Sequence, residues 1–332
     1  MIYKKHHVRL GLLGFGTVGQ GIAEIFEMKK RKIEEKAGCT LEIAAVAVRN
    51  INKKRDISLP QEVFTTDAES IVNRDDIDVV IEVMGGIEPA KTLTMKALEN
   101  GKPVITANKA LLADHAQEIF AWAQKHDQPM GYEGSVAAGL PIIDIMRDGL
   151  AGNELQEVSG ILNGTTNFIL SQMQEEGQSY EEAFAHADSL GYLEADPSLD
   201  VDGWDAAHKL VILASIVYRR YFHLNDVDRT GISGITPERI AKAKAEGKVI
   251  KLIASARVEE GKVELRVRPE EFPKEHYLAQ VSGGMNGIWV RGDCIGQSFF
   301  KGPGAGSLPT ASAVMSDLIS ILRDPRMTGF GF

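Results

Sequence analysis

The sequence predicts an α/β protein in which a doubly wound, mainly parallel sheet is followed by an α+β domain. Three observations support this prediction. Apolar, β-branched runs alternate with helical patterns as far as about residue 131, a glycine-rich turn joins the first run to the first helix, and several strand patterns follow one another directly after residue 248. Strict alternation favours a parallel sheet with right-handed crossovers, whereas strands without intervening helices favour antiparallel pairing.

The first part of the chain carries apolar runs typical of buried parallel strands, separated by segments with helical periodicity. In the first helical segment Ile22, Ile25 and Phe26 fall on one face, and Gly101 closes the second segment. The predicted strands cover residues 8–13, 41–48, 78–83 and 103–106, and the predicted helices cover residues 18 to about 37, 89–100 and 113–126.

The later part of the chain has helices first and strands afterwards, so we expect a mainly antiparallel sheet whose meander is a candidate dimerisation surface. The predicted helices cover residues 140–150, 167–176, 180–190, 204–219, 237–246 and 307–322. The predicted strands cover residues 249–258, 263–267, 278–281 and 287–291.

Charge and composition exclude several classes of protein. The 37 basic and 46 acidic residues give a net charge of −9, whereas binding to nucleic acid or an acidic membrane needs a concentrated positive field. The longest apolar segment, around residues 210–217, is far too short to span a bilayer, and the first residues do not resemble a signal peptide. We therefore expect a cytoplasmic protein. Cys39 and Cys294 lack metal-ligand or CxxC spacing, which favours reduced thiols.

The stretch Gly14-Phe15-Gly16-Thr17-Val18-Gly19 fits the pattern GxGxxG. The pattern alone is weak, but here it follows a predicted strand and opens a predicted helix, which is the context of a dinucleotide site. Gly14 would allow the tight turn, Gly16 the approach of a pyrophosphate, and Gly19 close packing of helix on strand. The helix N-terminus would add N–H donors. The alternative is a purely structural glycine turn.

The residues after the second predicted strand bear on the choice between NAD and NADP. An acidic residue usually stands there in NAD sites, but this chain has Arg49-Asn50, then Lys53, Lys54 and Arg55. A guanidinium suits a 2′-phosphate, so we favour NADP(H), with NAD(H) as an alternative. The competing interpretation is a solvated basic loop.

Further stretches resemble the homoserine dehydrogenase family, in order along nearly the whole chain. They are Thr106-Ala107-Asn108-Lys109, Tyr132 to Pro141, Asn163-Gly164-Thr165-Thr166-Asn167, Leu190 to Pro197, Asp200 to Lys209 and Gly304-Ala305-Gly306. The regulatory extension that many members carry after the last helix is not in this sequence, so it resembles the short form. The resemblance implies a Rossmann domain of residues 1–132 with about 303–332, a catalytic and dimerisation domain of residues 133–302, and a homodimer.

The resemblance also implies the reaction. An NAD(P)-dependent hydride transfer would interconvert L-aspartate 4-semialdehyde and L-homoserine, in the biosynthesis of threonine, methionine and isoleucine. Lys209 would be the general acid and base, Asp205 would position its ammonium and the substrate, and Glu194 would bind the substrate amino group. Lys109, at the end of a strand, would contact cofactor and substrate and is the rival proton donor. From spacing alone, Asp205 and Lys209 would be an ordinary surface ion pair one helical turn apart.

Other members of the implied site come from the same resemblance. Thr106 and Gly304 would join Lys109 in binding the cofactor. A monovalent cation, sodium or potassium, would be held by the Glu133 carboxylate and the carbonyls of Val136, Ala138 and Leu140; the alternative is that Glu133 only hydrogen-bonds this loop. Gly164-Thr165-Thr166 could bind the substrate carboxylate or form a plain turn.

Two rival functions use parts of the same pattern. Another amino-acid dehydrogenase could be built from the same two domains, but an acylating semialdehyde dehydrogenase would need a nucleophilic cysteine in a glycine-rich loop, which neither Cys39 nor Cys294 provides. A non-catalytic dinucleotide-binding protein could keep the glycine turn alone, without the joint set of Lys109, Glu194, Asp205 and Lys209.

Overall fold

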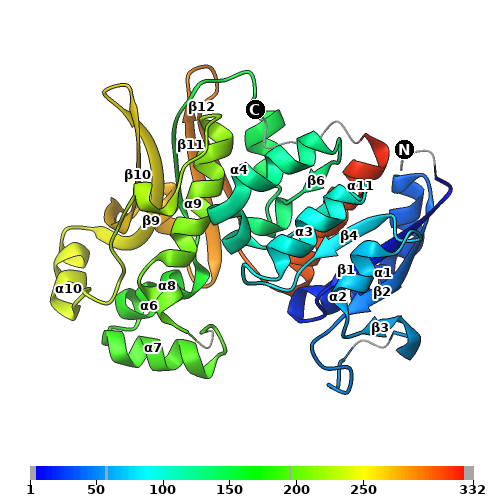
Figure 1. Cartoon of the computed structure of the whole chain (residues 1–332). Coiled ribbons are helices and arrows are strands. Elements are labelled where there is room, and N and C mark those ends of the chain that lie inside the picture. Colours follow the sequence, from blue (N-terminus) through cyan, green and yellow to red (C-terminus); the bar gives the residue numbers. More distant parts are fainter. Residues whose placement is uncertain (1–4, 57–58, 194–195, 325–332) are drawn as a thin grey trace. The chain divides into compact units, whose positions relative to one another are not determined.

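The computed structural model describes residues 5–56, 59–193 and 196–324. The chain divides into two compact units, Met1–Asp144 with Ala305–Phe332, and Ile145–Gly304. Each unit is built around one six-stranded sheet. Figure 1 shows the ribbon of the chain with its labelled strands and helices. Within the described ranges, no helix has both the length and the apolar character required to cross a membrane.

The first unit contains a sheet in which every strand pair is parallel. Its strands are β1 (His7–Leu13), β2 (Thr40–Ala47), β3 (Phe64–Thr65), β4 (Val79–Glu82), β5 (Val104–Thr106) and β6 (Met130–Gly131). Their order is β3-β2-β1-β4-β5-β6, so the direction of winding reverses between β1 and β4, where such sheets bind ligands. The predicted doubly wound parallel sheet is confirmed. The sequence pattern missed β3 and β6, because two residues are too few to show a period.

Helices cover both faces of this sheet (Figure 1). The helices of this unit are α1 (Thr17–Ala37), α2 (Ala68–Asn73), α3 (Ala90–Glu99), α4 (Lys109–Lys125), α5 (Ile142–Asp144) and α11 (Ser307–Arg323), and its 3-10 turns are η2 (Gln61–Val63) and η3 (Glu133–Ser135). Val8, Leu10 and Leu12 of β1 are fully buried in one core with α1 and α11. Gly11 faces the opposite side, where a Cβ would lie 2.5 Å from Ile71 of α2. The last helix therefore packs in the same unit as the first.

The second unit contains a mixed sheet in the order β12-β11-β7-β9-β10-β8. The strands are β7 (Leu155–Ile161), β8 (Val227–Arg229), β9 (Lys248–Glu259), β10 (Lys262–Pro273), β11 (Met285–Gly292) and β12 (Gly296–Pro303). Only the β8–β10 pair is parallel, which confirms a mainly antiparallel sheet. The expected continuous meander is wrong, because β7 lies between the hairpins β9–β10 and β11–β12. The sequence pattern did not predict β7, because polar residues and a glycine interrupt the apolar pattern of Leu155–Ile161.

The helices of the second unit lie largely where the sequence predicts them. They are η4, a π-helical turn (Ile145–Gly149), α6 (Gly164–Glu175), α7 (Tyr180–Ser189), α8 (Ser198–Val201), α9 (Trp204–Val217), η5 (Leu224–Asp226), α10 (Pro237–Ala245) and η6 (Tyr277–Gln280). The strand predicted at residues 278–281 is wrong, because a ring nitrogen of His276 accepts the N–H of Leu278 and starts the 3-10 turn η6. The helix predicted at residues 140–150 is divided into α5 and η4.

Candidate active site

The turn between β1 and α1 has the geometry that the glycine pattern predicts. Gly14 has a φ of +106°, and a Cβ there would lie 2.7 Å from the Val83 carbonyl oxygen of β4's flanking loop. A Cβ at Gly19 would lie 2.6 Å from the Gly14 carbonyl oxygen, so this glycine brings α1 close to the turn. Gly16 is exposed, and no described atom lies within 4 Å of the position that its Cβ would take. Open space beside the N-terminus of α1, which has no side-chain cap, fits a pyrophosphate.

The other residues of the glycine turn have different roles in the structure. Phe15 is buried, and its ring packs edge-on against Phe64 of β3 at 5.4 Å between centroids. Val18 packs against the core of the unit. Thr17 is exposed at the first turn of α1, and its carbonyl accepts a hydrogen bond from Ser307 of α11. Only Thr17 therefore offers a side chain to a ligand at this turn.

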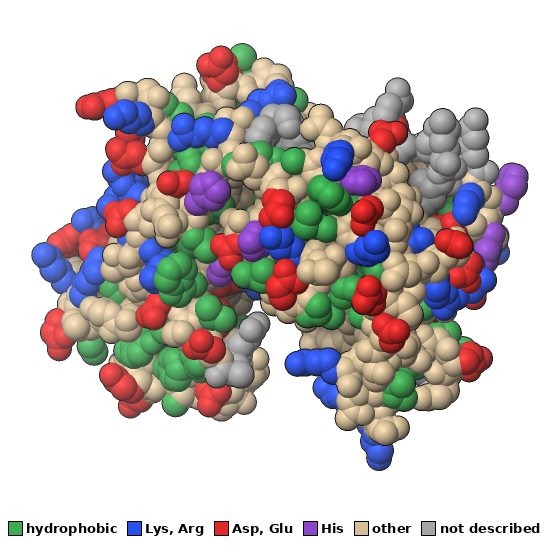
Figure 2. All heavy atoms as spheres, viewed as in Figure 1, with side chains coloured by type: hydrophobic (Ala, Val, Ile, Leu, Met, Phe, Trp, Pro, Cys, Tyr) green, Lys and Arg blue, Asp and Glu red, His purple; other side chains and the backbone are tan. Residues whose placement is uncertain are grey.

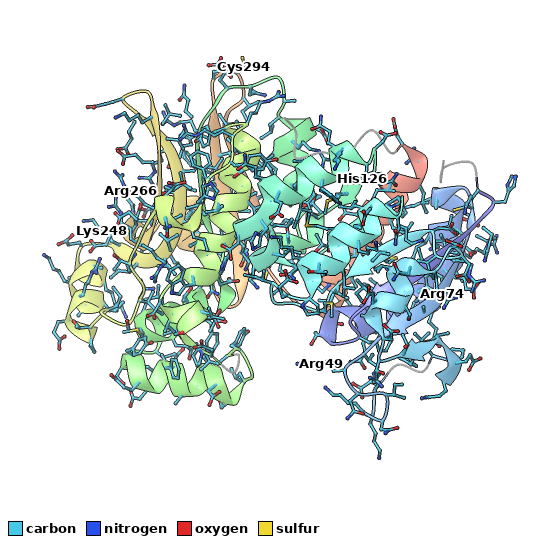
Figure 3. The ribbon with its side chains drawn as sticks, in the orientation of Figure 1. Arg49, Arg74, His126, Lys248, Arg266 and Cys294 are labelled. Carbon is cyan, nitrogen blue, oxygen red and sulfur yellow. The ribbon has the colours of Figure 1, made fainter. Side chains whose placement is uncertain are left out.

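The basic loop that follows β2 contains two arginines with different roles. Arg55 donates to the carbonyls of Asn50, Ile51 and Lys53, and its guanidinium lies 5.0 Å from the ring centre of Phe64. This side chain therefore holds the loop together. Arg49 is exposed just beyond β2 and is labelled in Figure 3. Figure 2 shows basic side chains gathered on this loop, as an anion site needs.

The carboxyl ends of β4 and β5 carry a buried polar network. Glu82 is fully buried, and burial raises the pKa of its carboxyl group. It accepts hydrogen bonds from the Thr106 hydroxyl at 2.6 Å and the Met84 amide at 2.9 Å. Thr106 in turn accepts from the amide of Asn108. The Thr106 side chain is thus occupied in ordering this edge.

Lys109 is the first residue of α4, which begins there rather than at residue 113 because the Asn108 side chain accepts the N–H of Leu111 and caps the helix. Lys109 is half-buried. A cation at a helix N-terminus is electrostatically unfavourable for the helix, so helix stability does not explain this lysine. It lies at the edge of the sheet where ligands bind.

The loop after β6 is organised by Glu133, which is 2% exposed. One carboxylate oxygen accepts the N–H of Ile143 at 2.9 Å and the other accepts that of Asp144 at 2.9 Å. These bonds end the loop and start α5, as the capping interpretation of Glu133 expects. Ala137 has a φ of +46°, a conformation that is rare for a non-glycine residue. Among the described residues, no group of three or more His, Cys, Asp or Glu side chains is placed to hold a metal ion.

Lys209 lies in the interior of the second unit, on α9. Its Nζ is 2.7 Å from Oδ2 of Asp205 and 2.7 Å from the carbonyl oxygen of Leu162. Lys209 and Asp205 are each 8% exposed. The surface ion pair that spacing alone suggests is therefore wrong. A buried ion pair costs desolvation energy and contributes little net stability, so its presence favours a functional role.

Two polar side chains beside this pair were not singled out in the sequence. Asn163 donates one amide hydrogen to Asp200 at 2.6 Å and another to Asp205 at 2.8 Å. Asn286 of β11 donates to the Leu162 carbonyl at 3.2 Å, the same oxygen that accepts from Lys209. The only signal in the sequence was the position of Asn163 and Asp200 within the stretches that carry the family resemblance.

The remaining predicted site residues have separate surroundings. Glu194 lies outside the described residues. Gly304 follows β12, and a Cβ there would lie 2.1 Å from the Asn286 side chain, so only glycine fits. Thr166 is committed to Asn163, while Thr165 donates to the carbonyl of Tyr192. Both threonine hydroxyls therefore have hydrogen-bond partners within the protein.

Comparisons with known proteins agree with this arrangement. A family model described as "Homoserine dehydrogenase, NAD binding domain" matches residues 14–133, and one described as "Homoserine dehydrogenase" matches residues 141–319. The chain is 42% identical over 327 residues to the homoserine dehydrogenase of Bacillus subtilis, an alignment covering 98% of this chain and 76% of that protein. The chain belongs to the homoserine dehydrogenase family. Its activity is accordingly that of an NAD(P)-dependent oxidoreductase.

Solved structures of homoserine dehydrogenases share the fold. That of the Thiobacillus denitrificans enzyme superposes with a TM-score of 0.91 at 41% identity, covering 96% of this chain and 75% of that chain. A hyperthermophilic archaeal homoserine dehydrogenase mutant in complex with NADPH gives a TM-score of 0.79 at 30% identity, covering 95% of this chain and 97% of that chain. The observed pair of sheets is therefore the homoserine dehydrogenase architecture.

Proposed function

We propose that this homoserine dehydrogenase family member interconverts L-aspartate 4-semialdehyde and L-homoserine, with Lys209 as the proton donor and acceptor. The observation that supports this most directly is the buried ammonium of Lys209, held by Asp205 and the Leu162 carbonyl. Such a reaction would serve the synthesis of threonine, methionine and isoleucine. We further propose that the protein is a cytoplasmic homodimer.

The chemistry requires a proton at the oxygen of the reacting carbon. A bound nicotinamide supplies or accepts the hydride. In the reducing direction Lys209 gives a proton to the aldehyde oxygen as negative charge develops there, and in the oxidising direction its neutral amine accepts the hydroxyl proton. Two of the three ammonium donors are engaged by described residues, which fixes the direction of the third.

Substrate binding is assigned to three residues. Asp205 carries a buried carboxylate suited to the substrate as well as to Lys209, and Glu194 would bind the amino group. Lys109, at the carboxyl edge of the first sheet, would bind substrate and cofactor and is the rival proton donor. Its position at an unfavourable helix end supports a ligand-binding role.

NADP(H) is the cofactor that the first unit favours, with NAD(H) as the alternative. The glycine turn has open space at Gly16 for the pyrophosphate, and exposed Arg49 suits the 2′-phosphate. The archaeal relative that was solved with NADPH is consistent with this proposal. Residues 15, 17, 18, 106 and 304 complete the proposed cofactor-binding set.

A monovalent cation, sodium or potassium, is proposed at the loop of Glu133, with carbonyls of Val136, Ala138 and Leu140. The unusual backbone of Ala137 supports a specialised loop, because such conformations cluster at functional sites. The capping bonds hold the Glu133 carboxylate inside this loop, 2.9 Å from the amides of Ile143 and Asp144. We propose a structural rather than a catalytic ion.

The proposed activity is tested by reduction of NADP at alkaline pH, followed by absorbance at 340 nm, with L-homoserine as the substrate. L-Threonine and L-serine, which are also amino acids with a hydroxyl group in the side chain, are the matched control substrates. We expect turnover with homoserine only. Equal turnover of serine would instead indicate another amino-acid dehydrogenase, and no turnover with a bound dinucleotide would indicate a non-catalytic protein.

A further inference from the structure

Asn163 lies between β7 and α6 and is 4% exposed. Its side-chain oxygen accepts the backbone N–H of Thr166 at 2.8 Å, which makes Asn163 the N-cap of α6. A backbone N–H can only donate, so the oxygen of the amide must face Thr166 and the nitrogen must face the other way. The orientation of this amide is therefore fixed by its neighbours.

The amide nitrogen faces two carboxylates. It donates to Oδ1 of Asp200 on α8 at 2.6 Å and to Oδ2 of Asp205 on α9 at 2.8 Å. Asp200 is 9% exposed and Asp205 is 8% exposed. One neutral side chain thus gives each of its two hydrogens to a different buried carboxylate and joins three helices, α6, α8 and α9.

The same oxygen of Asp205 serves both Asn163 and Lys209. Oδ2 accepts from Nδ2 of Asn163 and from Nζ of Lys209, so its two lone pairs are directed at these two donors. The carbonyl that holds the other side of the ammonium belongs to Leu162, the residue immediately before Asn163. The turn after β7 therefore holds the Asp205–Lys209 pair from two sides.

We infer that Asn163 is a positioning residue for catalysis, which holds the carboxyl groups of Asp200 and Asp205 side by side and thereby fixes the ammonium of Lys209. This inference rests on the proposed function, in which Lys209 transfers the proton. Two neighbouring carboxyl groups repel each other when both are charged, and the two amide hydrogens of Asn163 offset that repulsion without adding a charge. The cap of α6 alone would not require the amide, because serine and aspartate cap helices equally well.

The distinction between cap and positioning residue gives a direct test. Asn163→Asp and Asn163→Ser both keep a capping oxygen for Thr166, but neither can donate to two carboxylates. We expect kcat to fall at least about tenfold in each variant, while the Kd for NADPH stays unchanged because the first unit is untouched. Asn163→Asp puts a further carboxyl group beside the Asp205–Lys209 pair, and its negative charge favours the protonated amine, so the acid limb of the kcat profile for homoserine oxidation should move to higher pH.

Thr236→Ala is the matched control, because Thr236 caps α10 at an exposed position of the same unit. It should lower the melting temperature and leave kcat and its pH profile unchanged. If both Asn163 variants behave like Thr236→Ala, Asn163 is only a helix cap and the inference is wrong.

A failure of the proposed function is recognised separately with Lys209→Met. Normal turnover in Lys209→Met would show that the proton donor has been misassigned. An inactive Lys209→Met beside Asn163→Asp with an unmoved acid limb would overturn the positioning role alone. A crystal structure of Asn163→Ser in which the 2.7 Å contact between Asp205 and Lys209 is lost would support the inference without reference to turnover.

Discussion

Nζ of Lys209 lies 2.7 Å from Oδ2 of Asp205, one helical turn away on α9, and both side chains are buried. Most of the other residues on α9 are apolar and buried as well. An ion pair placed on such a helix is costly unless its hydrogen bonds are satisfied. Here the Leu162 carbonyl and the Asn163 amide provide those bonds. This arrangement fixes the geometry of the ammonium.

The first prediction separates the two candidate proton donors. Lys209→Met should lower kcat by about 10² to 10⁴-fold, the usual worth of general acid catalysis, and should leave cofactor affinity intact. Lys109→Met should weaken ligand binding as well as turnover, because Lys109 lies at the ligand-binding edge of the first sheet. Steady-state and single-turnover kinetics with independent nucleotide titration make the comparison. Lys248→Met, at a half-buried position outside the proposed site, is the control.

A different kinetic result would identify Lys109 as the proton donor. Near-normal single-turnover hydride transfer in Lys209→Met, beside an inactive Lys109→Met with normal ligand affinities, would make Lys109 the proton donor.

A second prediction concerns cofactor choice. Arg49→Ala should weaken NADP(H) binding by about 1.5 to 3 kcal/mol, the range for a charged hydrogen bond, and should barely change NAD(H) binding. Arg55→Ala should weaken both cofactors, since Arg55 holds the carbonyls of the loop. Lys53→Ala, exposed on the same loop, is the control. Equal losses for both cofactors in Arg49→Ala would assign Arg49 to loop folding instead.

Features that depend on neighbouring residues were predicted correctly from the sequence. Features that depend on contacts between distant segments were not. The glycine turn is a local signal, since Gly14, Gly16 and Gly19 act within one strand–turn–helix unit. The spacing of Asp205 and Lys209 likewise shows that they share a helix face. It cannot show that this face is buried, which depends on how the second unit packs.

The residues around Lys209 could not be predicted from the sequence pattern, because they also come from distant segments. Asn163 is 42 residues from Asp205 and 37 from Asp200, and the three meet only because β7 brings Asn163 to this place. The sequence pattern did not reveal β7. A pattern search therefore finds the ion pair but misses the groups that hold it.

A third prediction tests the pyrophosphate site with two neighbouring glycines. Gly16→Ala should fold normally, because its Cβ meets no described atom, but it should raise the Kd for NADPH at least about tenfold by filling the open space. Gly14→Ala should destabilise the protein by about 1 to 3 kcal/mol, because its φ of +106° is strained for alanine. Thermal unfolding and nucleotide titration measure the two effects. Unchanged NADPH affinity in Gly16→Ala would place the pyrophosphate elsewhere.

The fourth prediction concerns the proposed cation. At constant ionic strength, sodium or potassium chloride should raise the melting temperature relative to choline chloride, because an ion that binds only the folded state stabilises it. Glu133→Gln should abolish this difference. It should also cost about 1 to 3 kcal/mol in any salt, since its amide NH₂ would face a backbone donor, the N–H of Ile143 or Asp144. Identical melting temperatures for the parent protein in all three salts would leave Glu133 as a cap only.

The last prediction concerns Lys251 of β9, a second buried lysine in the second unit, 3% exposed. Its Nζ donates to Oδ1 of Asn167 at 3.0 Å and to the carbonyl of Val281 at 2.7 Å. Burial lowers the pKa of Lys251 to about 8, and the nearby charges of Glu175 and Lys301 act in opposite directions. The ammonium is therefore less favourable in the folded protein than in the unfolded chain, where a lysine titrates near ~10.4.

Between pH 8 and about 10.4 the unfolded chain thus holds a proton on Lys251 that the folded protein has lost, so stability attributable to this group rises with pH. The slope is at most about 1.4 kcal/mol per pH unit. We expect the free energy of unfolding of the parent protein to increase relative to that of Lys251→Met from pH 7.5 to 9.5, as measured by urea titration at several pH values. Lys248→Met, at a half-buried position on the same strand, should show a constant difference from the parent. A constant difference for Lys251→Met as well would mean that its ammonium stays protonated in the folded protein throughout this range, held by Asn167 and Val281.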